Sequence, residues 1–142
     1  MRTGVLILAL GLVACTSPPL PESWPIANTD YLLKTSSDDL SQAFTIGLQS
    51  ISNRDLCFLK QDWPFPDGNW IGEGKFKIVS GAVSIDVPNE NFGSCVGKSC
   101  TTRLKPHTER TAKLNYAVFG EPDTITRLKD KRLEYSLGLY FC

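Results

Sequence analysis

The feature that most constrains this fold is an alternation of apolar and polar residues with a period of two. It is clearest near the C-terminus, where apolar side chains occupy every second position: Leu133, Tyr135, Leu137, Leu139 and Phe141. Because neighbouring side chains of a strand point to opposite sides, this pattern predicts a strand with one buried face. Shorter stretches of the same kind lie at 75–78, 83–87 and 114–118, and residues 56–60 are a further short strand candidate. Ser80-Gly81 separates two of them and predicts a hairpin.

The segment 37–51 fits two interpretations, a helix beginning at Ser37 or a strand near 43–50. Gly47 and the β-branched residues favour the strand. Residues 120–123, Gly-Glu-Pro-Asp, are typical of a turn. Six or seven short strands separated by turns predict an all-β fold, with one antiparallel sandwich or small barrel-like domain.

The N-terminus carries the pattern of a secretory signal. The positive charge of Arg2 precedes an apolar run from Val5 to Ala14, which is too short to span a bilayer as a helix. Leu12-Val13-Ala14-Cys15 resembles the lipobox of bacterial lipoproteins. The resemblance implies cleavage before Cys15 and acylation there with chains such as palmitate, whereas the alternative is an ordinary signal peptide with a chance cysteine. Thr16, where inner-membrane lipoproteins carry aspartate, implies an outer-membrane anchor facing the periplasm.

The composition divides the chain into three parts. Residues 1–14 form the signal peptide, and residues 15–29 form the lipidated cysteine and a linker, in which four prolines predict an extended spacer. Residues 30–142 form a single β domain. A domain of this length buries only about 60–65% of its unfolded surface, so we expect cross-links to contribute to its stability.

The number of cysteines is odd, but assigning Cys15 to lipid leaves an even set: Cys57, Cys95, Cys100 and Cys142. In an oxidising compartment, these four residues predict two disulfides. Three pairings are open. A Cys95–Cys100 bond would close a short loop and stabilise little, so we favour a pairing that joins Cys57 and Cys142 to the segment 95–100.

No sequence motif predicts catalysis. The chain lacks Gly-x-Ser-x-Gly. Gly97-Lys98-Ser99 is not a phosphate-binding loop, because Phe92 occupies the position of its first glycine. His107, the single histidine, has no marked nucleophile beside it, and we expect it to lie exposed in a polar loop. The cysteine spacing does not fit a metal site with His107. We therefore expect a protein that is not an enzyme and holds neither cofactor nor metal.

An aromatic segment at 63–70, Trp-Pro-Phe-Pro-Asp-Gly-Asn-Trp, is the first feature that suggests binding. Trp63, Phe65 and Trp70 are stiffened by two prolines and would form a rigid contact surface of the kind found at interface hot spots. The alternative is that these rings fold back over the sheet as additional core.

Uneven charge is the second feature. Residues 16–95 hold five basic and ten acidic side chains, whereas residues 96–132 hold nine basic and four acidic ones. If the basic side chains gather on one face, that face would attract an acidic partner; otherwise they are ordinary solvated residues. The candidate contact residues are Trp63, Phe65, Trp70, Arg103, Lys105, His107 and Arg110.

The chain resembles type VI secretion immunity lipoproteins in its size, in its lipobox and in a cysteine carried by a predicted strand. That cysteine lies in the stretch Asn53-Arg54-Asp55-Leu56-Cys57-Phe58. Lysozyme-inhibitor lipoproteins share this plan, although their inhibitory loop motif is absent. The resemblance implies a non-catalytic envelope lipoprotein that binds a protein partner, either a toxin or a lytic enzyme. The further cysteines and the basic second half depart from the plan, so no binding residues are transferred. The alternative is a structural or assembly accessory of the outer envelope.

The near-neutral net charge of the chain gives nucleic-acid binding little support.

Overall fold

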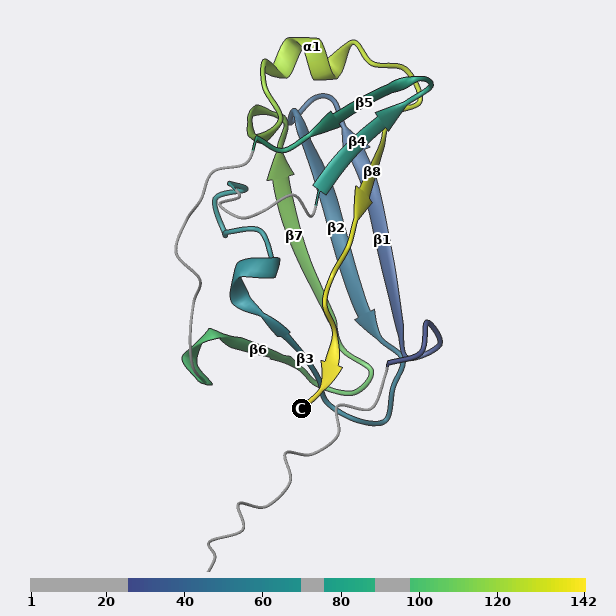
Figure 1. Cartoon of the computed structure of the whole chain (residues 1–142), viewed down its shortest axis with the longest axis vertical. Coiled ribbons are helices and arrows are strands. Elements are labelled where there is room, and N and C mark those ends of the chain that lie inside the picture. The colour runs from purple at the N-terminus through teal and green to yellow at the C-terminus, as the bar shows by residue number, and fades with distance from the viewer. Residues whose placement is uncertain (1–25, 70–75, 89–97) are drawn as a thin grey trace, which may run out of the picture.

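The computed structural model describes residues 26–69, 76–88 and 98–142. In this part of the chain, three antiparallel sheets of three strands each are accompanied by one short α-helix (Figure 1). The prediction of a mostly β domain is therefore confirmed. The signal peptide, Cys15 and most of the linker lie outside the described residues.

The three sheets are built from strands distant in sequence. The first has the order β1-β2-β7, with β1 at Tyr31–Asp38, β2 at Ala43–Ser50 and β7 at Glu109–Asn115. The second has the order β6-β3-β9, with β6 at Thr101–Leu104, β3 at Leu56–Leu59 and β9 at Tyr140–Phe141. The third has the order β5-β4-β8, with β5 at Val83–Asp86, β4 at Phe76–Ser80 and β8 at Arg132–Tyr135.

Helical turns connect these strands. Three short 3-10 helices are η1 at Lys60–Asp62, η2 at Lys98–Cys100 and η3 at Tyr116–Val118. The segment predicted as a turn begins the helix α1 (Pro122–Thr126), so the prediction of a simple turn is wrong. Pro122 stands at the first position of the helix, where its fixed φ and missing N–H are tolerated. Within the described residues, no helix has the length and apolar character needed to cross a bilayer.

One hydrophobic cluster joins the three sheets. Phe44 of β2, Phe58 of β3 and Phe76 of β4 are fully buried in it. The Phe44 ring lies 5.0 Å from that of Tyr116, and the Phe76 ring stacks on Tyr135 at 4.2 Å. Aromatic pairs at these distances add to the stabilisation from buried area. The strand prediction for 43–50 is confirmed, since alternate side chains of β2 enter this core, and the helical interpretation of 37–51 is wrong.

The strand predicted for 133–141 is interrupted. β8 ends at Tyr135 and pairs with β4, whereas β9 pairs with β3 in another sheet. Leu137 and Leu139 still pack against the core between them, so the side chains alternate without a continuous ladder. Likewise, the stretch predicted at 114–118 leaves the sheet at η3. The β4–β5 hairpin is confirmed, and Gly81 in its turn has a φ of +56°.

A disulfide joins Cys57 in β3 to Cys142 and links residues 85 positions apart. The pairing favoured from the sequence, with both cysteines bonded to the segment 95–100, is therefore wrong. The reason is that β9 pairs with β3 and brings the C-terminus beside Cys57, where the Cys142 N–H donates to the Asp55 carbonyl at 3.2 Å. Cys100 is also disulfide-bonded, and Cys95 lies outside the described residues.

Candidate functional site

Trp63 follows η1 and is only 4% exposed. Its ring packs against Phe58 and Tyr135, with centroid distances of 5.4 and 6.4 Å. The Tyr135 hydroxyl donates to the Asp62 carbonyl, which holds the end of η1 against β8. Burial raises the pKa of Tyr135, so its hydroxyl stays protonated and able to donate. The structure thus places Trp63 in the core. Trp70 lies outside the described residues.

The segment that follows Trp63 is fixed to the end of β7 by a turn. Gly68 accepts a hydrogen bond from the Asn115 N–H at 2.8 Å, and the Asn115 side chain donates to the Asp67 carbonyl at 3.0 Å. Gly68 has a φ of +81°, and a Cβ there would lie 2.6 Å from Oδ1 of Asn115. Hydrogen bonds from the backbone and side chain of Asn69 hold the pKa of Asp67 below its usual value. These contacts require glycine at 68 and orient residues 63–67 along β7.

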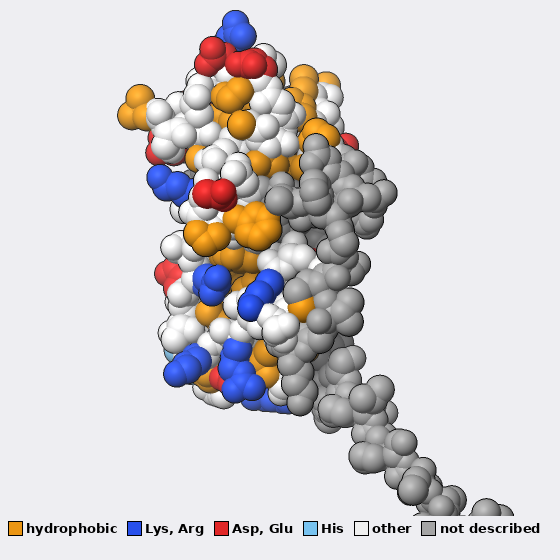
Figure 2. Space-filling model, turned by 90° about the vertical axis from the view of Figure 1, so that its left-hand side faces the viewer, with side chains coloured by type: hydrophobic (Ala, Val, Ile, Leu, Met, Phe, Trp, Pro, Cys, Tyr) orange, Lys and Arg blue, Asp and Glu red, His pale blue; other side chains and the backbone are white. Residues whose placement is uncertain are grey.

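A groove of about 380 Å³ lies between this segment and β7, and we call it the β7 groove. Its lining consists of Thr45, Trp63, Pro64, Phe65, Pro66, Arg110, Thr111, Ala112 and Lys113. Phe65 is 41% exposed. The side of the molecule that carries β6 and the segment after η1 shows hydrophobic side chains at mid-height, with Lys and Arg side chains below them (Figure 2). The groove is therefore concave and partly apolar.

Arg110 and Lys113 make the β7 groove cationic. The Arg110 guanidinium lies 5.8 Å from the centre of the Trp63 ring, a cation–π distance. The ion pairs observed in the described part of the chain involve other cations, and neither Arg110 nor Lys113 takes part in one. The described lining contains no carboxylate, histidine or thiol. The pKa of Asp38 is lowered mainly by hydrogen bonds from Ser41, and the charge of Lys113 lowers it further, so Asp38 offsets part of that charge. The groove therefore presents an aromatic wall beside two cations that form no direct ion pair within the described residues.

The other basic candidates do not line the groove. Arg103 in β6 pairs with Asp55 at 3.3 Å, and Lys105 is exposed in the connection to β7. His107, in the same connection, is exposed and has a φ of +55°. Its Nε2 lies 2.8 Å from Oδ1 of Asn53, an amide rather than a nucleophile or a carboxylate. Of the seven candidates, the structure brings Trp63, Phe65 and Arg110 together.

Three residues that no sequence motif marks complete the site. Thr45 and Lys113 are paired neighbours on the exposed face of the first sheet, and Thr111 lies two positions along β7. Lys113 is one of the nine basic residues of 96–132, and its place directly before the 114–118 alternation was the available signal. Thr45 and Thr111 carry no such signal, because their role depends on strand pairing. Among the described residues, no group of three His, Cys, Asp or Glu side chains is positioned to hold a metal ion.

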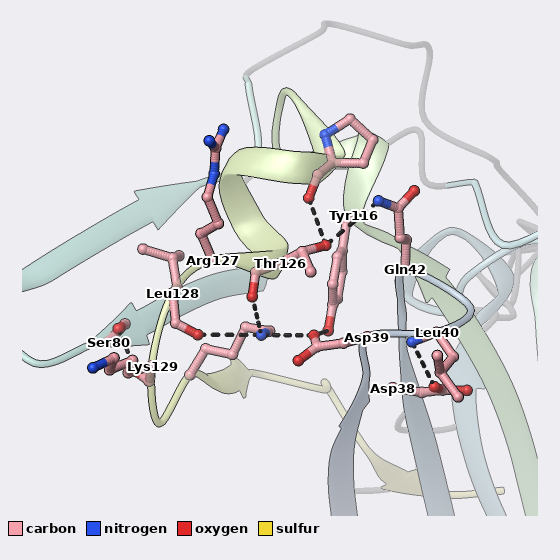
Figure 3. A network of polar contacts seen from close by, with 12 residues as sticks. Asp38, Asp39, Leu40, Gln42, Ser80, Tyr116, Thr126, Arg127, Leu128 and Lys129 are labelled. Carbon is pink, nitrogen blue, oxygen red and sulfur yellow. Dashed lines mark hydrogen bonds and ion pairs between the residues drawn. The ribbon is translucent and has the colours of Figure 1, made fainter.

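A second polar cluster surrounds Lys131, whose side chain is 4% exposed. Its Nζ lies 2.7 Å from Oδ1 of Asp39 and donates to the carbonyls of Thr126 and Leu128, both at 3.2 Å. The Tyr116 hydroxyl donates to the same Asp39 oxygen at 2.8 Å. Asp39, Tyr116, Thr126 and Leu128 converge on this point (Figure 3). The cluster therefore ties α1 and the segment after it to the β1–β2 connection, and we assign it a structural role.

The hydrogen bonds from Lys131 and then from Tyr116 hold the pKa of Asp39 below its ordinary value of 3.8. A carboxylate whose pKa is lowered by folding stabilises the fold above the unfolded-state pKa, and that contribution is lost as the pH falls through the folded-state value. Burial is the main cause that raises the pKa of Tyr116, and the hydrogen bond to Asp39 raises it further. The hydroxyl of Tyr116 therefore stays protonated and remains a donor.

Substitution Lys131→Met is expected to lower the free energy of unfolding at pH 7 by about 1–3 kcal/mol, because two carbonyls lose their charged donor. The difference from the wild type should shrink as the pH falls through the folded-state pKa of Asp39, which lies below 3.8. Urea unfolding at a series of pH values measures this. Lys129→Met is the matched control, since that side chain is exposed. A loss that is independent of pH would contradict the assigned role of Asp39.

The chain matches no protein-family model, and no curated protein or solved structure is significantly similar to it.

Proposed function

We propose that the chain is a non-catalytic envelope lipoprotein whose β domain binds a protein partner through the β7 groove. The observation that carries this proposal is the aromatic wall beside Arg110 and Lys113, two cations that form no direct ion pair within the described residues. Aromatic and arginine side chains dominate the energetics of protein interfaces. Because the described lining holds no carboxylate, histidine or thiol to act with Lys113 on a substrate, binding fits the groove better than catalysis does.

The proposal also includes a lipid anchor on Cys15 and a second disulfide. Lipid on Cys15 would hold the chain at the outer membrane, facing the periplasm. Because Ile26 packs against the core and residues 27–30 form a turn, only residues 15–25 of the predicted linker would be free to extend, with a reach of about 35 Å. We further propose a second disulfide between Cys95 and Cys100, and a sandwich-like arrangement of the sheets around their shared core. Both suit a small domain that must remain folded outside the cytoplasm.

The proposed partner is a toxin or lytic enzyme that acts in the envelope. Support comes from the resemblance to immunity lipoproteins in size, lipobox and strand-borne cysteine, and from the groove. Arg110 and Lys113 would meet an acidic surface of the partner, while Phe65 would contact an apolar side chain.

Affinity capture tests this function. The mature lipidated chain, held in detergent, serves as bait for envelope extracts, and the captured protein is then titrated by calorimetry. Phe65→Ala and Lys113→Glu should each weaken its binding about tenfold or more, as expected for hot-spot residues. A captured lytic enzyme should also lose activity when the chain is added.

Two surface variants serve as controls. Val83→Ala removes an exposed apolar side chain on β5, and Lys129→Glu reverses an exposed charge after α1. Both should bind like the wild type. If no partner is captured, or if the groove variants bind as tightly as these controls, the proposed function is wrong. A captured protein that belongs to an envelope assembly and keeps its activity would favour the accessory role.

A further inference from the structure

β7 is an edge strand in the part of the chain that the structure describes. It pairs with β2 on one side, and in the order β1-β2-β7 it has no strand on the other. The residues of β7 from Arg110 to Lys113 line the β7 groove. The groove therefore lies along an open edge of the first sheet.

The hydrogen bonds at the two ends of β7 show which of its backbone groups face outward. The Thr108 carbonyl accepts from the Ser50 N–H at 2.9 Å, and the Tyr116 N–H donates to the Gln42 carbonyl at 2.8 Å. Between them, the register with β2 is continuous. In an antiparallel pair, alternate residues bond to the partner strand, so the even-numbered residues of β7 face β2.

The odd-numbered residues consequently direct their N–H and C=O groups away from β2. Asn115 confirms this direction, because its N–H donates to the Gly68 carbonyl on the outer side at 2.8 Å. For Thr111 and Lys113, the described residues provide no partner for the outward N–H and C=O groups. These groups form a short open ladder beside the segment 63–66.

The side chains around this ladder select the chemistry of a ligand. Arg110 and Lys113 contribute positive charge, and Phe65 contributes exposed apolar surface. A lysine on an edge strand disfavours pairing with a second copy of the same strand, because the like charges would lie close together. The edge therefore favours an acidic segment over self-association.

We propose that the partner inserts an extended acidic segment into the β7 groove and adds a strand to the open edge of β7. This inference rests on the proposed function, since it uses the same groove. Thr111 and Lys113 bind the backbone of the segment through their outward groups. Arg110 and Lys113 bind its carboxylates, and Phe65 contacts an apolar side chain of the segment.

The test compares Thr111→Pro with Thr111→Val. Proline removes the outward N–H of position 111, and this change is compatible with an edge strand because no bond to β2 is lost. Valine keeps both the N–H and the branched shape. The probe is a phage-displayed library of random twelve-residue peptides, selected on the mature lipidated chain in detergent. The enriched peptides are then synthesised and titrated.

We expect acidic, strand-forming peptides that bind Thr111→Pro about tenfold or more weakly than Thr111→Val. Peptides N-methylated at alternate backbone positions should also bind more weakly. In the wild type, bound peptide should slow the hydrogen exchange of the Thr111 and Lys113 amides. Circular dichroism and urea unfolding check that the proline variant is folded, and the amide exchange of the wild type provides the test if it is not.

The outcomes separate this inference from the proposed function. If Lys113→Glu weakens binding of the captured partner but the proline and valine variants bind the peptides equally, the groove remains the contact surface and strand addition is wrong. A selection that yields no acidic peptide, or unchanged exchange at Thr111 and Lys113, also overturns strand addition. If the Phe65→Ala and Lys113→Glu variants bind the captured partner normally, both proposals fail.

Discussion

Replacing Cys57 and Cys142 together with alanine is expected to lower the free energy of unfolding by about 4–5 kcal/mol. The bond joins residues 85 positions apart, so in the unfolded chain it closes a long loop and removes much conformational entropy. Because small domains have about 5–15 kcal/mol of stability in total, the variant should be only marginally folded at 37 °C. Urea unfolding of the two proteins under oxidising conditions measures the difference.

The local effect should centre on β9. This strand contains two residues, and its contact with β3 is supported by the disulfide and by the bond from the Cys142 N–H to Asp55. Without the disulfide, the backbone amide hydrogens of residues 140–142 should exchange with solvent faster than those of the other strands. Reductant should lower the free energy of unfolding of the wild type to nearly that of the variant, and it should change the free energy of unfolding of the variant much less. An oxidised wild type that unfolds at the same urea concentration as the variant would contradict the prediction.

The sequence predicted the strands whose two faces differ. In β2 and β4, alternate side chains enter the core, so the apolar pattern has the period of a strand. β1 was not predicted because it is an edge strand with most of its side chains exposed, so little contrast distinguishes its faces. β6 was also missed, since only Leu104 of its four side chains is buried.

The disulfide pairing could not be derived from local patterns. It follows from the antiparallel contact of β9 with β3, which joins the C-terminus to the middle of the chain. The sequence alternation in 133–141 gave no sign that the strand divides between two sheets. Leu137 and Leu139 face the core in either case, so their apolar character is the same whether or not the ladder continues.

The candidate site was predictable in its aromatic part and only partly in its charges. The basic residues of 96–132 serve different roles, because their partners come from elsewhere in the chain. Arg103 pairs with Asp55, Lys131 is buried against Asp39, and Arg110 lies over Trp63 in the groove. Charge counts do not distinguish these environments. The outward ladder at Thr111 depends on β7 being an edge, which only the strand order reveals.

Substitution Cys15→Ser is expected to abolish membrane attachment. In the proposed lipoprotein, Cys15 is the only residue that carries acyl chains, each buried CH₂ of which contributes about 0.8 kcal/mol. Since one myristoyl chain gives only marginal binding, several chains together are required for a durable anchor. Serine has no thiol to form the thioether, so cleavage before residue 15 should fail as well. Labelled palmitate and membrane fractionation measure the two effects.

The matched control is Ala14→Gly, which keeps a small residue before Cys15 and should be labelled and fractionate like the wild type. Mass spectrometry should find an acylated Cys15 at the N-terminus of both proteins. If the wild type is not labelled and retains Met1, the proposed lipid anchor is wrong. The oxidising compartment, from which the second disulfide was inferred, is then wrong as well. The β7 groove would still stand on its own geometry, but the Cys57–Cys142 pair would then lie in a reducing compartment, and the partner would have to be sought inside the cell.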